Sequence, residues 1–487
     1  MLFRTRNQQG TQSAQPLMIQ SSNRRWRGAL YLLLFAAWAQ AFGQVSVLDP
    51  SFKVDMKAAD GVDTLVLQPD QRILVGGEFT AIGGCSNSFL ARLNSDGSLD
   101  ASFNPPGQTD GAVSRLLQQP DRKVLVGGSF GRLLGHAQPA LARLLEDGSL
   151  DAAFDTSATF NTNTWITSLA LQDDGQLLVG YRVLDNSVSH VVRVNTNGAL
   201  DTTFVCTNEI YGYIFALVPQ PDGVLFGGNY CNVAGSTNNA LFRLKQDGRL
   251  DDSFDAGLNT SSVFCMLHHP NGQILVGGAL YRTGASAGVP LLRLNADLHW
   301  DSSFKPDAFG DSVIPGLATY SLLLQPDGKL VVGGYFSDVG GYYRRNILRF
   351  TPESHVDGCF DPGLGLGNTD QPGPVRVLAL QPDGRILIGG WFVGVDTAFG
   401  QCNVARLLPK SDCNLIRVYI KGGDQTFAAA TFPPGGTNYL EQSSDLKNWQ
   451  IVQTFNSSYN SPYIYYDWNW FSLTNAPQAF CRARQDR

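Results

Sequence analysis

The chain has 487 residues, of which 43% are hydrophobic and 16% charged, and its formal net charge is −6 at pH 7. The charge is mildly acidic and no basic stripe stands out along the chain, so nucleic acid is excluded as an expected partner.

The first 43 residues are predicted to be a secretory signal and not part of the fold. Arg24, Arg25 and Arg27 precede an apolar run over 28–41, which ends in the small-residue pattern Ala39-x-Ala41. Basic, apolar and small residues in this order are typical of a secretory signal. The run is too short for a comfortable membrane span, and no other segment could cross a bilayer. The sequence therefore predicts a secreted or cell-surface protein with no membrane span after signal removal.

An internal repeat of about fifty residues occupies residues 44–410. A period of this size is typical of four-stranded propeller blades. Each copy carries an apolar run ending in a glycine pair, which favours a strand buried on both faces and a close backbone approach or bulge at its end. The seven copies of this element read QPDQRILVGG (68–77), QPDRKVLVGG (119–128), QDDGQLLVGY (172–181), QPDGVLFGG (220–228), HPNGQILVGG (269–278), QPDGKLVVGG (325–334) and QPDGRILIGG (381–390).

The end of each copy predicts a hairpin followed by a fourth strand. In RLNSDGSLDASF (92–103), a loop with Gly97 in the left-handed region pairs Asn94 with Ser98 and sets Arg92 opposite Asp100. A cross-strand ion pair contributes about 0.2–1 kcal/mol, so its repetition indicates a structural brace; the alternative is a chain of ligand-binding arginines. The pair recurs at 143/151, 193/201, 243/251, 293/301 and 349/357.

The two ends of the repeat array complement each other. LDPSF (48–52) is a fourth strand without a third strand before it, and NVARLL (403–408) is a third strand without a fourth after it. Joining them completes one blade and removes exposed sheet edges. The sequence thus predicts an all-β, seven-bladed propeller closed by a split blade, with an open solenoid as the alternative. The recurring fourth-strand aromatics are Phe52, Phe103, Phe154, Phe204, Phe254, Phe304 and Phe360.

The repeat QPDGkilvGG…aRLnxdGslDxsF resembles the delta-60 repeat of bacterial secreted and surface proteins, and its glycine pair is more loosely similar to kelch blades. The resemblance covers about three-quarters of the chain and implies a β-propeller. It implies no common set of catalytic residues.

Residues 411–487 form a second unit, expected to be a small β-sandwich-like module. YLEQSSDLKNW and a terminal FCRA resemble a β module at the C-terminus of many secreted bacterial proteins, with Cys481 in place of a tyrosine. The chain has eight cysteines, and an even count in an exported protein permits disulfides. The predicted disulfide joins Cys413 and Cys481, which bracket this module.

Loop lengths predict where binding occurs. Both tight turns of each blade lie on one face, and the longer, more variable connections lie on the other. Aromatic residues with arginines in these connections can stack on sugars or anchor a protein partner; padding of loops and inter-blade seams is the other interpretation. The candidate ligand-binding residues are Trp165, Tyr211, Tyr230, Tyr281, Tyr342, Tyr343 and Arg344, with Tyr213 and Arg345 beside them.

No catalytic set, cofactor or metal site is predicted. The chain has no CxxC or HExxH, and its six histidines fall at different repeat positions. The favoured function is a non-catalytic recognition module for a glycan or protein. The alternative is a polysaccharide-directed enzyme with its site at the mouth of the central channel, which converging carboxylates or histidines there would favour.

Overall fold

The structure is a computed structural model, and within the part of the chain that it describes every regular element is a β-strand. The described residues are 48–49, 51–56, 60–84, 89–103, 109–234, 236, 240–283, 288–306, 317–336, 338–339, 342–343, 345–357, 360, 373–393, 402–409, 415–420, 426–431, 436–443, 450–457, 463–467 and 480–485.

Each repeat contributes three consecutive antiparallel strands, apart from short hairpins inserted before the third. The first strands are β1 (Val62–Leu67), β4 (Val113–Gln118), β9 (Thr164–Leu171), β12 (Ile210–Gln220), β15 (Leu258–His268), β18 (Ala318–Leu324) and β23 (Val375–Leu380). The second strands are β2 (Ile73–Gly77), β5 (Val124–Gly128), β10 (Leu177–Val183), β13 (Gly223–Val233), β16 (Ile274–Arg282), β19 (Leu330–Tyr335) and β24 (Ile386–Val393). The third strands are β3 (Leu90–Leu93), β8 (Leu141–Leu144), β11 (Val188–Val194), β14 (Leu241–Lys245), β17 (Gly288–Leu294), β22 (Ile347–Phe350) and β25 (Cys402–Leu407). The inserted hairpins are β6 (Arg132–Leu133) with β7 (His136–Ala137), and β20 (Asp338–Val339) with β21 (Tyr342–Tyr343).

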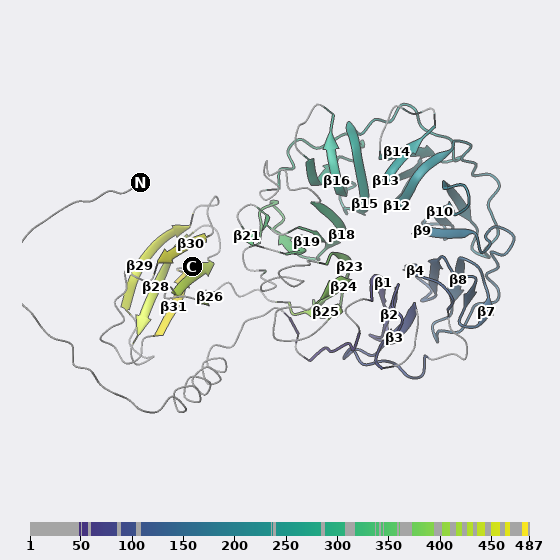
Figure 1. Ribbon diagram of the computed structural model, residues 1–487. Coiled ribbons are helices and arrows are strands. Elements are labelled where there is room, and N and C mark those ends of the chain that lie inside the picture. The colour runs from purple at the N-terminus through teal and green to yellow at the C-terminus, as the bar shows by residue number, and fades with distance from the viewer. Residues whose placement is uncertain are drawn as a thin grey trace, which may run out of the picture. The chain divides into compact units, whose positions relative to one another are not determined.

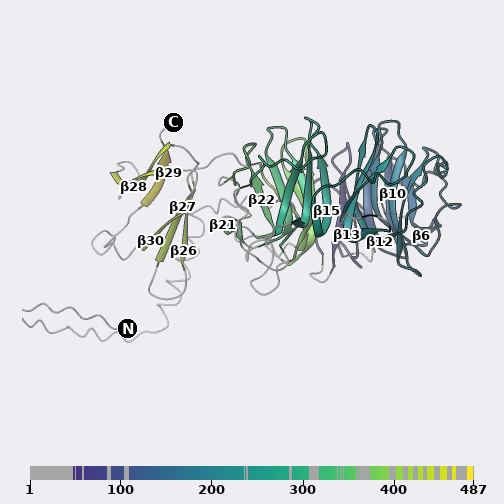
Figure 2. The ribbon, with the colours of Figure 1, turned by 90° about the horizontal axis from the view of Figure 1, so that it is seen from above.

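The first strand of every repeat is the innermost of that repeat's three strands (Figure 1). The third and fourth repeats are also joined into one six-stranded sheet through β11 and β12. These strands contact one another in chain order, from β1 to β23, and β23 also contacts β1. Figure 2 shows neighbouring sheets from another side, with β12, β13 and β15 close together. The seven innermost strands therefore surround a common centre.

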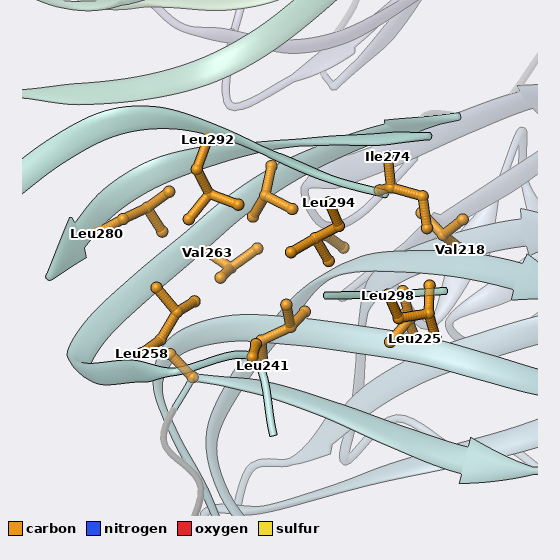
Figure 3. Packing of buried hydrophobic residues seen from close by; sticks show 14 of the residues in the cluster. Val218, Leu225, Leu241, Leu258, Val263, Ile274, Leu280, Leu292, Leu294 and Leu298 are labelled. Carbon is orange, nitrogen blue, oxygen red and sulfur yellow. The ribbon is translucent and has the colours of Figure 1, made fainter. Parts of the chain in front are cut away.

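Apolar packing between neighbouring sheets forms the core. The second strands β2 and β5 are buried at every residue, as expected for strands covered on both faces. Figure 3 shows Val218, Leu225 and Leu241 of one repeat packed with Val263 and Ile274 of the next. Each fully buried side chain of this size contributes about 1.5–3 kcal/mol, so the sheets stabilise one another along the array.

The glycine pair permits the approach that its position predicts. A Cβ on Gly77 would lie 2.1 Å from the carbonyl oxygen of Gly61, which directly precedes the adjoining strand β1. Only glycine tolerates a backbone this close.

The predicted fourth strand is wrong in extent. After the hairpin, each repeat forms a single bridge, such as Leu93 with Leu99, and then turns. Asp100 causes the turn, because its Oδ1 accepts hydrogen bonds from the backbone N–H and the hydroxyl of Ser102 at 3.0 and 2.6 Å. An aspartate that bonds two residues ahead favours a turn over a continued strand. The turn buries the aromatic residue that follows, Phe103.

The predicted Arg–Asp brace is confirmed and is mostly buried. Arg92 Nε donates to Asp100 Oδ2 at 2.7 Å, with both side chains under 10% exposed. Its guanidinium lies 4.7 Å from the ring centroid of Phe103 and donates to the carbonyl of Asp147 in the next repeat. The arginine therefore links three elements within and between blades, which supports the structural interpretation. Ion pairs of the same kind join Arg143–Asp151, Arg193–Asp201, Arg243–Asp251, Arg293–Asp301, Arg349–Asp357 and Arg406–Asp49.

The last of these pairs joins the ends of the repeat array. Leu48 bridges Leu407, and the backbone N–H of Asp49 donates to the carbonyl of Arg406 at 2.8 Å. Arg406 also donates to the carbonyl of Ser95 in the first repeat. Val62 and Val404 belong to one buried cluster, so the first and last repeats share a core.

The C-terminal segment contains two three-stranded antiparallel sheets. Their orders are β26-β27-β30 and β29-β28-β31. The predicted disulfide falls here: Cys413 lies outside the described residues, and only the backbone of Cys481 is described. The strands are β26 (Leu415–Ile420), β27 (Thr426–Thr431), β28 (Gly436–Ser443), β29 (Gln450–Ser457), β30 (Tyr463–Asp467) and β31 (Phe480–Gln485).

Candidate binding site on the innermost strands

The sequence-predicted aromatics lie in strands and not in loops. Trp165 is in β9, Tyr211 in β12, Tyr230 in β13 and Tyr281 in β16. The loop assignment was wrong because β12, β13 and β16 continue beyond the glycine pair, as the pairing of Tyr211 with Asn232 shows. Tyr342 and Tyr343 form β21, with only their backbone described, Arg344 lies outside the described residues, and Arg345 is half-buried.

These residues do not form one group. Tyr230 is 80% exposed, Tyr211 47% and Tyr281 41%. Tyr211 donates its hydroxyl to Glu209 Oε2 at 2.5 Å. Trp165 on β9 instead packs edge-on against Tyr213 on β12, with ring centroids 5.6 Å apart. Both rings therefore lie on innermost strands.

A β-bulge occurs at the same place in every innermost strand. In β1 the bulge lies between Val62, which pairs with Gly77, and Thr64, which pairs with Gly76, so Asp63 has no partner across the strand. Bulges re-aim side chains and are frequent beside functional sites. The residues at these bulge positions are Asp63, Ser114, Thr167, Phe215, Phe264, Tyr320 and Arg376.

Side chains at the bulge positions contact one another around the centre. Phe215 and Phe264 have ring centroids 6.0 Å apart, and Phe264 and Tyr320 are 4.7 Å apart. The guanidinium of Arg376 lies 5.8 Å from the Tyr320 ring. Tyr213 stacks on Phe215 at 5.6 Å. We call Trp165, Tyr213, Phe215, Phe264 and Tyr320 the aromatic row; all five are partly exposed.

The row ends in a polar group shared by the first and last repeats. Arg376 NH1 donates to Asp63 Oδ1 at 3.1 Å, across 313 residues of sequence. Trp391 Nε1 donates to the same oxygen at 3.1 Å, and Arg376 lies 5.0 Å from the Trp391 ring. Gly61 makes room for the indole, because a Cβ there would lie 2.4 Å from Trp391 Cε2.

Glu78 and Arg115 are two further charged groups near the centre. Desolvation and then repulsion from Asp63 raise the pKa of Glu78. Burial lowers the pKa of Arg115 to about 10, so its side chain is still a cation at neutral pH. Part of the residue stays exposed. Its guanidinium lies 5.9 Å from the Phe215 ring, two strands further round the centre.

Sequence reasoning did not single out several charged and aromatic residues near the centre. They are Asp63, Glu78, Arg115, Phe215, Phe264, Tyr320, Arg376 and Trp391. One signal could have found the bulge positions. When the repeats are aligned on their glycine pairs, these positions follow a β-branched residue, which is valine or isoleucine in six repeats and Thr319 in the other, but they differ in chemistry from repeat to repeat.

A second surface feature lies at the tight turns of the third and fourth repeats. It is a shallow, open depression of about 820 Å³ lined by residues that include Arg193, Asp222 and Arg243. Its arginines are committed to neighbours: Arg243 pairs with Asp222 and Asp251, and Arg193 pairs with Asp201. The aromatic row, whose five rings are partly exposed, is the stronger candidate.

The described residues contain no helix that is both long and apolar enough to span a membrane. They also contain no cluster of three or more His, Cys, Asp or Glu residues arranged to hold a metal ion.

Comparison with known families identifies the repeat. Residues 68–103, 119–154, 172–204, 220–254, 269–304, 325–358 and 381–410 match the family described as "Domain of unknown function (DUF5122) beta-propeller". The chain is therefore a β-propeller protein with seven repeats of this family.

Distant likenesses exist among solved structures, whereas no curated protein matches the chain. Puromycin hydrolase is 14% identical with a TM-score of 0.41, over 79% of this chain and 61% of that one. The Dos1 propeller is 11% identical with a TM-score of 0.43, over 79% and 93%. Regucalcin from Agrobacterium tumefaciens is 13% identical with a TM-score of 0.32, over 58% and 85%. At these values no function follows from any of them.

Proposed function

We propose that the protein is an exported recognition module that binds a glycan through the aromatic row. The observation that carries the proposal is the run of contacting, partly exposed rings at successive bulge positions, from Phe215 through Phe264 to Tyr320. Aromatic faces beside a few placed polar groups are typical of ligand sites. A glycan is favoured over a protein because the rings lie on the innermost strands and not on an outer face.

The proposal includes the architecture that presents the row. The propeller closes as a ring through a split blade, in which residues 48–52 complete the sheet of β23, β24 and β25. The Leu48–Leu407 bridge and the Arg406–Asp49 pair support this closure. Residues 1–43 act as the export signal, residues 411–487 form a sandwich-like accessory module, and the protein works outside the cell or at its surface.

A glycan array probed with labelled residues 44–487 tests the function. We expect binding to a structurally related group of glycans, and loss of that binding when Phe264 and Tyr320 are both changed to Leu. Leucine keeps apolar volume and removes the flat ring face. Absence of binding to every glycan, by a protein that is folded by circular dichroism, would contradict the proposal.

One observation favours an enzyme as the second candidate. Asp63 and Glu78 lie near enough to interact, and the raised pKa of Glu78 suits a general acid. In this case the Glu78→Gln variant would abolish release of sugar from a bound polysaccharide while leaving its binding intact. Binding without any release by the unaltered protein would exclude this candidate.

A further inference from the structure

We infer that the glycan is acidic, and that Arg115 and Arg376 bind its carboxylate or sulfate group beside Trp391. The inference rests on the proposed function and adds the chemical class of the ligand. The first observation is the position of Arg115. This residue belongs to β4 but reaches the ring of Phe215 on β12, and β9 lies between these two strands in the order of contacts.

Small residues at two bulge positions leave the space for this reach. Ser114 and Thr167 are buried, and their hydroxyls bond to backbone carbonyls, at 2.5 Å to Ile166 and 3.2 Å to Gly180. Neither side chain extends toward the centre as the phenylalanines and Tyr320 do. The guanidinium of Arg115 therefore occupies the part of the centre that the aromatic row leaves open.

The charge of Arg115 is not neutralised by a close carboxylate among the described residues. The hydrogen bond recorded for its side chain goes to the carbonyl of Ser114, at 2.7 Å. Arg376 is near enough to disfavour its protonated form, and Asp63 to favour it. Two arginines that face one carboxylate and repel each other form a site for a further anion, because an anion between them relieves the repulsion.

The charges near the centre agree with a site for an anion. Among the described residues near the centre, the arginines Arg115, Arg182 and Arg376 outnumber the carboxylates Asp63 and Glu78. Arg182 is held over the Tyr213 ring at 4.3 Å and donates to the carbonyl of Gly212. Asp63 is occupied by Arg376 and Trp391, which leaves the centre with excess positive charge. A guanidinium fork matches the oxygens of a carboxylate or sulfate.

The test uses a glycan array that carries chemically matched oligosaccharides. It compares oligosaccharides containing uronic acid with their methyl esters, which have the same skeleton without the charge, and with sulfated counterparts. We expect the acids or the sulfated members to bind at least tenfold better than the neutral members, since a charged hydrogen bond contributes about that factor. Whether acids or sulfated members bind better identifies the anionic group.

Arg115→Gln should remove this preference, and Arg115→Lys should keep part of it. The matched control is Arg249→Gln, because Arg249 is 78% exposed on a tight turn and its loss should change nothing. Equal binding of neutral and acidic members overturns the inference and leaves the proposed function standing. Absence of any glycan binding overturns both. An acid preference that persists in Arg115→Gln with a normal melting temperature overturns the role of Arg115.

Discussion

Arg406 Nε donates to Asp49 Oδ2 at 2.8 Å, joining two residues that are 357 positions apart. The same contact in the other repeats joins residues only eight positions apart, as between Arg92 and Asp100. The Arg406–Asp49 hydrogen bond therefore has nearly the same length as the Arg92–Asp100 bond, although its two residues come from opposite ends of the repeat array. The ion pair of the repeat is kept where these two ends meet.

Asp49→Asn should therefore destabilise the protein strongly. Both side chains are about 5% exposed, and removing one partner of a buried pair costs about 3–5 kcal/mol. Urea denaturation measures the change in the free energy of unfolding. The control Asp383→Asn alters a half-exposed carboxylate paired with Arg385, which should cost under about 1 kcal/mol. Equal effects of the two changes would contradict a structural role for the Asp49 pair.

Deletion of residues 44–53 should lower stability by several kcal/mol. It removes Phe52, which is fully buried and would alone contribute about 1.5–3 kcal/mol. It also leaves β25 as an exposed edge, so aggregation should rise. Scanning calorimetry and light scattering measure the two effects. A cooperative transition at an unchanged melting temperature would contradict the proposed closure through a split blade.

Stability should fall between about pH 4 and pH 2. Burial alone would raise the pKa of Asp201, but hydrogen bonds from Thr203 and Arg193 outweigh it and lower the pKa to about 2. The unfolded value is about 3.9. A lowered folded pKa adds stability that is present above the unfolded pKa and is lost as the pH falls through the folded pKa. Melting temperatures from pH 6 to pH 2 measure this loss. The prediction fails if the melting temperature stays constant over that range. The pKa is lowered in the same direction at Asp49, Asp100, Asp151, Asp251 and Asp301.

Two hairpin turns place a side chain where the others have glycine. Ser354 has φ 71° and Leu298 has φ 67°, which costs a non-glycine residue about 1–2 kcal/mol. Ser354→Gly should relieve this strain and leave stability equal or up to about 1 kcal/mol higher. Leu298→Gly should instead destabilise, because Leu298 packs in a buried cluster and loses about 1.5–3 kcal/mol of burial. Chemical denaturation of both variants checks the contrast, and a gain in stability for Leu298→Gly would contradict it.

Gly61→Ala should weaken ligand binding without unfolding the protein. The φ of Gly61 lies outside the left-handed region, so alanine fits the backbone, but its Cβ would overlap the Trp391 indole. The indole must then leave Asp63, which removes one hydrogen bond and should reduce affinity about five- to tenfold. Binding on the glycan array measures the affinity, and the melting temperature shows whether the variant stays folded. Unchanged binding would exclude Trp391 from the site.

The turn residues made the Arg–Asp brace predictable from the sequence. The binding site on the innermost strands could not be predicted in this way. Gly97 and the eight-residue spacing of Arg92 and Asp100 fix the hairpin register, and the structure keeps that register. The fourth strand was overestimated because its residues have strand-like alternation, while Asp100 bonds to Ser102 and turns the chain. The site depends on bulges at Phe215 and Phe264, and hydrophobic alternation does not reveal where an extra residue interrupts pairing.

Comparison of two sets of variants on the glycan array tests most directly where binding occurs. Phe264→Leu and Tyr320→Leu alter the aromatic row, and Tyr230→Ala and Tyr281→Ala alter exposed side chains of β13 and β16 that are not part of it. We predict that the first pair loses most of the binding and that the second pair keeps it, with all four proteins melting cooperatively. Binding that survives in the first pair and is lost in the second would contradict recognition at the innermost strands.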